Sequence, residues 1–345
     1  MNWFVCALLC IAGWGMADLF YKKGTDDSDR YSHLRIAAWV GLVMGISAVV
    51  ILLLQNAGIL PAAVSAAGPV SGTDTAAAKD PSADRWAQLF RNVLAYAPAS
   101  IPYILSMVIG YAGIRYLELS VISPVQNASG ALSVILMAGW LAAAGKSDEI
   151  LANVSALDIA GTLFIVAATI GLAIVEQKIS QAGDPADKGG SKYRFGALAL
   201  VFPLLYCLFD ALGTAADGMI LSGNGGLDLT EWDVLVLYGL TFFAAGLLCW
   251  IWLWIREGHP YRMFSAAERP KAAAALSEEC GQVFYVFAMA GDPMAAAPMV
   301  ASYCIVSVIL SHLFLKERLR AGQYACVAAF IIGIVLLGIS EGMAA

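Results

Sequence analysis

The sequence predicts an all-α integral membrane protein, and three observations carry this prediction. Hydrophobic residues make up 60% of the 345 residues, and charged residues make up only 13%. A soluble domain is usually about 45–50% apolar and about 25% charged, so this chain has more apolar surface than a soluble fold can bury. The apolar residues also form long continuous runs, whereas a transmembrane β-barrel shows alternating segments of about ten residues.

Ten of these runs approach the length of about 20 residues that an α-helix needs to cross a bilayer. The predicted spans are Asn2–Tyr21, Leu34–Leu54, Val93–Tyr116, Val121–Ala144, Leu157–Glu176, Phe195–Leu221, Val234–Ile255, Ala272–Ala290, Met294–Leu315 and Ala321–Ser340. Residues 55–86 are rich in Ala, Ser, Gly and Asp, which predicts a flexible external loop. Residues 257–271 are basic and partly apolar, which fits either a segment on the inner membrane surface or a solvated linker.

The distribution of basic residues predicts the orientation of the spans. The odd-numbered connections hold 16 of the 20 Lys and Arg residues. Cytoplasmic connections of membrane proteins carry such an excess, so both termini are expected outside the cytoplasm of a multi-pass protein in the cell (inner) membrane. The net charge of −6 leaves no basic surplus for phosphate groups, which argues against a nucleic-acid partner.

An internal repeat relates the two halves of the chain. Ser123–Leu136 and Ala297–Leu310 align at a proline, and both read Ser-Val-Ile-Leu nine residues later. Spans three to five therefore resemble spans eight to ten, and each half holds five spans. Because five is odd, the second half must enter the membrane inverted. Inverted repeats are typical of alternating-access secondary transporters, which hold substrate near the bilayer midplane.

This repeat predicts ten transmembrane helices arranged as two inverted five-helix repeats. Residues 1–177 form the first repeat, residues 178–194 form a cytoplasmic linker, and residues 195–345 form the second repeat.

The chain resembles the ten-helix, EamA-like members of the drug/metabolite transporter superfamily. The resemblance is strongest over Tyr285–Gly338, where the Leu315-Lys316-Glu317 turn and the Gly-containing final helix match the family. The first repeat departs from the family pattern, because Ala143 stands where the matching glutamate is expected. The resemblance implies a membrane carrier for a small metabolite, with no cofactor and no catalytic or metal site.

Polar residues inside the predicted spans are the candidate substrate-binding residues, because ionisable groups in a membrane are costly. Glu278, Gln282 and Tyr285 lie at i, i+4 and i+7, which places them on one helical face. Asp210 lies mid-span after a proline that favours a kink. Two amides that need hydrogen-bond partners are further candidates, Gln126 and Asn127. So are three aromatic side chains with polar tips, Trp14, Tyr103 and Tyr303.

Three further acids of the predicted spans, Glu279, Asp217 and Asp18, are expected to have structural roles rather than to bind substrate. Glu279 points about 100° away from Glu278 and is expected to reach the basic inner surface. Asp217 is expected near the external end, in contact with solvent. Asp18 and Lys22, at i and i+4, are expected to form an ion pair within one helix.

The sequence thus predicts a secondary transporter that holds a small polar metabolite, such as an amino acid or a sugar, in a central cavity between the repeats. An exporter of amphipathic drugs, or a flippase of lipid-linked intermediates, is the alternative on the same fold. An intramembrane enzyme is a weaker alternative, because the acids are dispersed over separate helices. Proton coupling through Glu278 or Asp210 and uncoupled facilitation are both compatible with the sequence.

Overall fold

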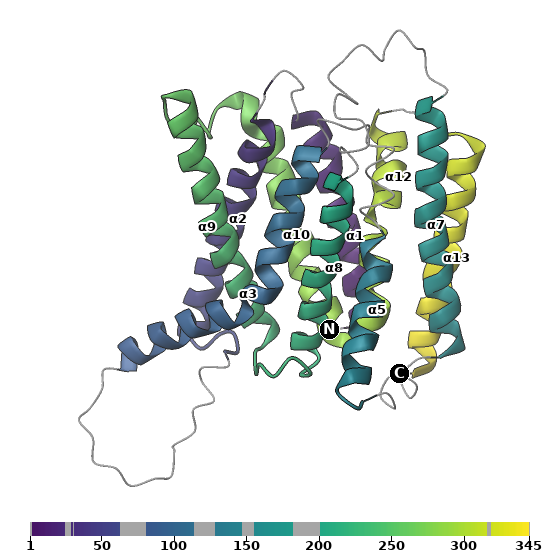
Figure 1. Ribbon diagram of the computed structural model, residues 1–345, viewed down its shortest axis with the longest axis horizontal. Helices are drawn as coiled ribbons and strands as arrows, with labels where there is room; N and C mark the ends of the chain where they lie inside the picture. Colours follow the sequence, from purple (N-terminus) through teal and green to yellow (C-terminus); the bar gives the residue numbers. More distant parts are fainter. Residues whose placement is uncertain are drawn as a thin grey trace.

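The computed structural model describes residues 2–24, 29, 31–62, 81–113, 128–146, 155–181, 201–315 and 319–344, and its ordered elements in these ranges are all helices. The first half contains α1 (Trp3–Gly24), α2 (Ser32–Asn56), α3 (Pro81–Gly113), α5 (Ser129–Ala143) and α7 (Ala156–Gln181). The second half contains α8 (Val201–Leu221), α9 (Glu231–Glu257), η4 (Ala266–Glu268), α10 (Arg269–Gly291), α11 (Pro293–Ala301), α12 (Tyr303–Leu315) and α13 (Ala321–Ala344). Figure 1 shows these helices side by side in one bundle, with both chain ends at the same end.

The helices give the chain the character of a multi-pass membrane protein. Seven are long and apolar enough to cross a bilayer: α1, α2, α3, α8, α9, the α11–α12 segment and α13. The helix α5 and the first part of α7 are apolar but shorter. The helix α10, which carries Lys271, Glu278 and Glu279, is not one of the seven, and it packs against α1, α2, α8, α9 and α11.

Two elements differ from the predicted spans. The predicted external loop 55–86 ends earlier than expected, because α3 begins at Pro81, a residue suited to the first turn of a helix. The predicted span Met294–Leu315 is not one helix but breaks at Ser302 into α11 and α12. Pro298 lies inside α11 and cannot donate a backbone hydrogen bond, which weakens the helix shortly before the break.

The helices pack in close pairs, of which α1 with α10, α2 with α9, α3 with α8 and α7 with α13 make the most extensive contacts. Glycines allow two of these pairs to approach closely. A β-carbon added at Gly41 on α2 would lie 2.4 Å from the backbone oxygen of Phe242 on α9. One added at Gly281 on α10 would lie 2.3 Å from the indole ring of Trp14 on α1. At Gly41 the backbones of α2 and α9 are therefore in close contact, and at Gly281 the Trp14 side chain packs directly on the backbone of α10.

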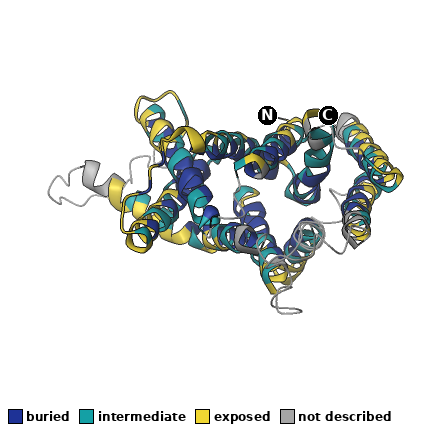
Figure 2. Ribbon diagram, turned by 90° about the horizontal axis from the view of Figure 1, so that it is seen from above, coloured by how far each residue is buried: buried dark blue, intermediate teal, exposed yellow. Residues whose placement is uncertain are grey.

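Burial separates the interior from an apolar periphery. Figure 2 shows buried residues turned towards the interior of the helix assembly and exposed residues around its outside. The exposed residues include large apolar side chains such as Leu163, Leu248 and Ile331. Lipid is the solvent that accommodates such a surface, whereas the polar side chains described below lie among the helices.

Candidate functional site

Asp217 lies at the centre of a hydrogen-bonded cluster that joins four helices. Its carboxyl, on α8, is 0% exposed. It accepts hydrogen bonds from the hydroxyls of Tyr96 on α3, Tyr238 on α9 and Tyr285 on α10, the last at 3.0 Å. Three donors satisfy most of the acceptor capacity of a carboxylate, so this cluster connects the helices strongly.

Aromatic rings extend this cluster towards α1 and α12. The ring of Tyr285 lies 5.4 Å from that of Trp14 and is stacked 6.5 Å from that of Tyr103. Trp14 also makes an edge contact, at 5.7 Å, with the ring of Tyr303. Two of the predicted aromatic candidates, Trp14 and Tyr103, therefore contact the predicted Tyr285, and a third, Tyr303, contacts Trp14.

The predicted face of α10 is buried in the same region. Glu278 is 7% exposed and Gln282 is 1% exposed. Both polar atoms of the Gln282 side chain, and the indole Nε1 of Trp14, have no hydrogen-bond partner within the part of the chain that the structure describes. A buried amide without partners costs free energy, so it is a strong indication of a group that binds something else.

Two further carboxyls flank this face. Asp18 on α1 accepts a hydrogen bond of 2.7 Å from the Ser307 hydroxyl of α12. Asp210 on α8 is half-buried, with the Ser106 hydroxyl 3.5 Å from its Oδ1. Glu278 lies close enough to Asp18, Glu279 and Asp210 to interact with all three electrostatically. We call Trp14, Asp18, Asp210, Glu278, Gln282, Tyr285 and Tyr303 the central polar cluster.

The structure corrects one prediction and adds residues that the sequence did not single out. Asp217 is not solvated at an external end, as predicted, but fully buried, because three tyrosines replace its water. Tyr96 and Tyr238 were not among the predicted site residues, because the two lie on helices other than α8. Gln126 and Asn127 lie outside the described residues. The side chain of Lys22 does too, so its predicted pair with Asp18 stays a prediction.

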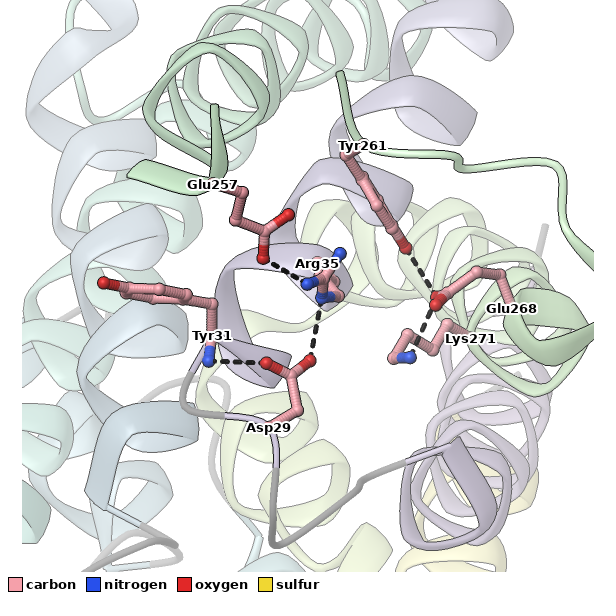
Figure 3. A network of polar contacts seen from close by, with 7 residues as sticks. All are labelled: Asp29, Tyr31, Arg35, Glu257, Tyr261, Glu268 and Lys271. Atoms are coloured by element: carbon pink, nitrogen blue, oxygen red, sulfur yellow. Dashed lines mark hydrogen bonds and ion pairs between the residues drawn. The ribbon is translucent and has the colours of Figure 1, made fainter. Parts of the chain in front are cut away.

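A second polar network lies at the opposite end of the bundle from the chain termini (Figure 3). Arg35 on α2 pairs with Asp29, at 2.7 Å, and with Glu257 at the end of α9. Its guanidinium lies 4.7 Å from the ring centre of Tyr261. These contacts connect α2, the end of α9 and the connection that follows.

The same network continues to the start of α10. Tyr261 donates a hydrogen bond to Glu268, and Lys271 pairs with Glu268 at 2.8 Å. Burial, together with the neighbouring Glu268, raises the pKa of the Tyr261 phenol well above its ordinary value, so this hydroxyl remains a donor. Each carboxylate of this network forms an ion pair with Arg35 or Lys271.

In the described ranges, no group of three or more His, Cys, Asp or Glu side chains is placed to hold a metal ion. The arrangement of the central polar cluster suits non-covalent recognition of a polar molecule: it offers carboxylates, one amide, an indole N–H and aromatic faces.

Comparisons with known proteins agree with this fold. Residues 219–339 match the EamA-like transporter family, which belongs to the drug/metabolite transporter superfamily, so the predicted resemblance is confirmed. A solved structure, described as the crystal structure of a protein, has a TM-score of 0.61 and 11% sequence identity, and the alignment covers 99% of this chain and 98% of that one. This likeness concerns the fold alone. The comparison with curated proteins found no match.

Proposed function

Because residues 219–339 match the EamA-like transporter family, we propose that this protein is a secondary transporter that moves a small polar metabolite across the cell membrane by alternating access. The observation that carries the proposal is the central polar cluster. Glu278, Gln282 and Tyr285 come from the second half of the chain, and Trp14 comes from the first. A polar site between two halves of a lipid-embedded bundle is accessible from alternate sides when the halves move relative to each other.

The pairing of the helices supports two inverted repeats, residues 1–177 and 195–345, joined by the linker 178–194. A pseudo-two-fold axis that relates them would exchange α1 with α8 and α3 with α10. It would therefore convert the pair α1–α10 into the pair α8–α3, and both pairs make extensive contacts. The pairs α2–α9 and α7–α13 would map onto themselves, and both are also extensive.

The break at Ser302 supports the same proposal. Interrupted helices beside a substrate site are a recurrent device of secondary transporters, because they place free helix ends at membrane depth. The break is flanked by Tyr303, which contacts Trp14 in the central polar cluster.

Exchange across liposomes tests the proposal. The purified full chain would be reconstituted with an unlabelled mixture of amino acids, sugars and nucleosides inside, and uptake of each labelled compound would be measured. We expect at least one compound to be exchanged. Glu278→Gln should reduce that exchange at least about tenfold, because a hydrogen bond to a charged group contributes about 1.5–3 kcal/mol.

Glu279→Gln is the matched control: Glu279 interacts electrostatically with Glu278, but it lies near Ser47 of α2 and not on the face of α10 that holds Gln282 and Tyr285. Exchange lost equally in both variants would indicate a general defect, and exchange lost in neither would remove the central polar cluster from the transport path.

An imposed proton gradient distinguishes proton-coupled transport from uncoupled facilitation. If Glu278 or Asp210 carries a coupling proton, an imposed pH gradient accelerates net uptake in the unaltered protein and has no effect in the neutral variants Glu278→Gln or Asp210→Asn. Net uptake that is indifferent to the gradient in the unaltered protein identifies uncoupled facilitation.

A further inference from the structure

The central polar cluster contains three acids, Asp18, Asp210 and Glu278, and Glu278 has no basic partner within the residues that the structure describes. Glu278 interacts electrostatically with Asp18, with its neighbour Glu279 and with Asp210. The sequence places no Lys or Arg within residues 272–291, the stretch of α10 that holds Glu278, whereas Asp18 on α1 lies one turn before Lys22. Buried carboxylates of this kind need a compensating positive charge or hydrogen-bond donors.

The acids differ in how well the protein itself satisfies them. Asp217 accepts three tyrosine hydroxyls and is therefore a structural connection between helices. Asp18 accepts a hydrogen bond from the Ser307 hydroxyl. Glu278 lies beside the hydroxyl of Tyr21 and next to other acids, which leaves most of its acceptor capacity for a ligand.

Two buried groups beside Glu278 point independently to a ligand. Gln282, one turn further along the same face of α10, is 1% exposed, and its amide donor and acceptor are both unpaired within the described residues. Trp14, 7% exposed, lies against Gly281 with its indole Nε1 unpaired in the same part of the chain. An acceptor on the ligand would satisfy the indole N–H, and a hydroxyl or an amide would satisfy Gln282.

Aromatic faces complete the chemistry of the site. Trp14 stands between the rings of Tyr285 and Tyr303, at 5.4 Å and 5.7 Å. The face of an indole ring attracts an ammonium group through its quadrupole, most strongly when both are away from water. Carboxylates and aromatic faces around one position favour a cation, and they disfavour the carboxylate of an anion or a zwitterion.

We propose that the central polar cluster recognises a small organic cation, an amine that also bears an uncharged hydroxyl or carbonyl group, with the ammonium at Glu278 and the uncharged group at Gln282 and Trp14. This inference rests on the proposed transport function and narrows its substrate class. Neutral sugars, anionic metabolites and amino acid zwitterions lack the charge that the acids require, or add a charge that they repel.

Compounds matched in shape and different in charge test this inference on the purified full chain. Glucosamine, glucose and glucuronate share one ring and most hydroxyls, and alaninamide, lactamide and lactate form a second, smaller set. Each compound would be assayed for stabilisation against thermal unfolding in detergent and for exchange in liposomes. We expect glucosamine or alaninamide to bind and to be exchanged at least about tenfold better than its neutral and anionic analogues.

Variants locate the interaction. Glu278→Gln should weaken binding of the preferred amine by about tenfold to hundredfold, and Gln282→Leu by about threefold to tenfold. Gln282→Lys, which places a cation beside Glu278, should abolish binding of the amine. Glu279→Gln should bind the amine like the unaltered protein.

The outcomes separate this inference from the transport function. Preferred exchange of a neutral or anionic compound overturns the cationic substrate class and leaves the transporter proposal in place. Amine binding that is unchanged in Glu278→Gln and Gln282→Lys also overturns the inference, because the amine then binds elsewhere. If folded protein exchanges none of these compounds, nor any amino acid, other sugar or nucleoside, the transport function itself is contradicted.

Discussion

At the scale of single residues, Asp217 illustrates how burial changes the role of an acid. Its carboxyl is fully buried, and the tyrosines that donate to it come from α3, α9 and α10. The nearby Asp210 is half-buried, with the Ser106 hydroxyl 3.5 Å away. The two acids lie on one helix, so a comparison between them measures the combined effect of full burial and the three tyrosine hydrogen bonds.

We predict that Asp217→Asn destabilises the protein by about 1–3 kcal/mol, because an amide N–H₂ group replaces an acceptor and leaves buried hydroxyls without partners. Asp210→Asn, which changes a less buried group, should have a smaller effect. The measurement is thermal unfolding in detergent. Equal melting temperatures for the two variants would contradict the structural role assigned to Asp217.

At the scale of helices, close approach depends on glycines at the crossing points. An added β-carbon at Gly41 of α2 would meet the backbone of α9, which cannot move aside as a flexible side chain can. Gly139 of α5 is also within a helix, but an added β-carbon there has no atom within 4 Å.

Gly41→Ala is therefore expected to destabilise the protein by about 1–3 kcal/mol through overpacking. Gly139→Ala should leave stability unchanged or increase it by up to about 1 kcal/mol, because alanine is the better helix former. Thermal unfolding of both variants checks the prediction, and a Gly41→Ala protein as stable as Gly139→Ala would show that α2 and α9 are not in close contact.

The polar network of Figure 3 connects helices at the end opposite the termini. Arg35 bridges Asp29 and Glu257, and all three side chains are mostly shielded from solvent. A double-mutant cycle with Arg35→Gln, Glu257→Gln and the double variant should give a coupling energy of about 0.5–2 kcal/mol in unfolding experiments. Strictly additive effects would mean that this pair does not stabilise the end of α9 against α2.

At the scale of the whole molecule, the order of the helices predicts which connections share one side of the membrane. Figure 1 places the α8–α9 connection at the same end as both termini, and the α9–η4 connection at the other end. The excess of basic residues in odd-numbered connections predicts that the first end lies outside the cytoplasm.

Thiol labelling in cells tests this orientation. A membrane-impermeant reagent should label Asn224→Cys, in the α8–α9 connection, in intact cells. It should label His259→Cys, in the α9–η4 connection, only after permeabilisation. The unaltered protein serves as the control for its native cysteines. The opposite labelling pattern would invert the proposed topology.

The sequence alone was sufficient for the class of protein, the approximate positions of the described helices, the polar face of α10 and the family resemblance. Each depends on local information: hydropathy along the chain, the helical period, and a motif. Composition alone excludes a soluble fold, and the spacing of Glu278, Gln282 and Tyr285 places them on one face wherever that helix packs.

Only the tertiary structure decided which of these polar residues meet. Tyr96 and Asp217 are 121 residues apart in sequence, and their hydrogen bond depends on the pairing of α3 with α8. The break at Ser302 and the helical start of α3 at Pro81 likewise lie inside stretches whose composition fits another structure. The physical reason is that lipid stabilises every apolar helix in the same way, so composition predicts only that a helix lies in the membrane. Close packing and complementary polar groups determine which helices become its neighbours.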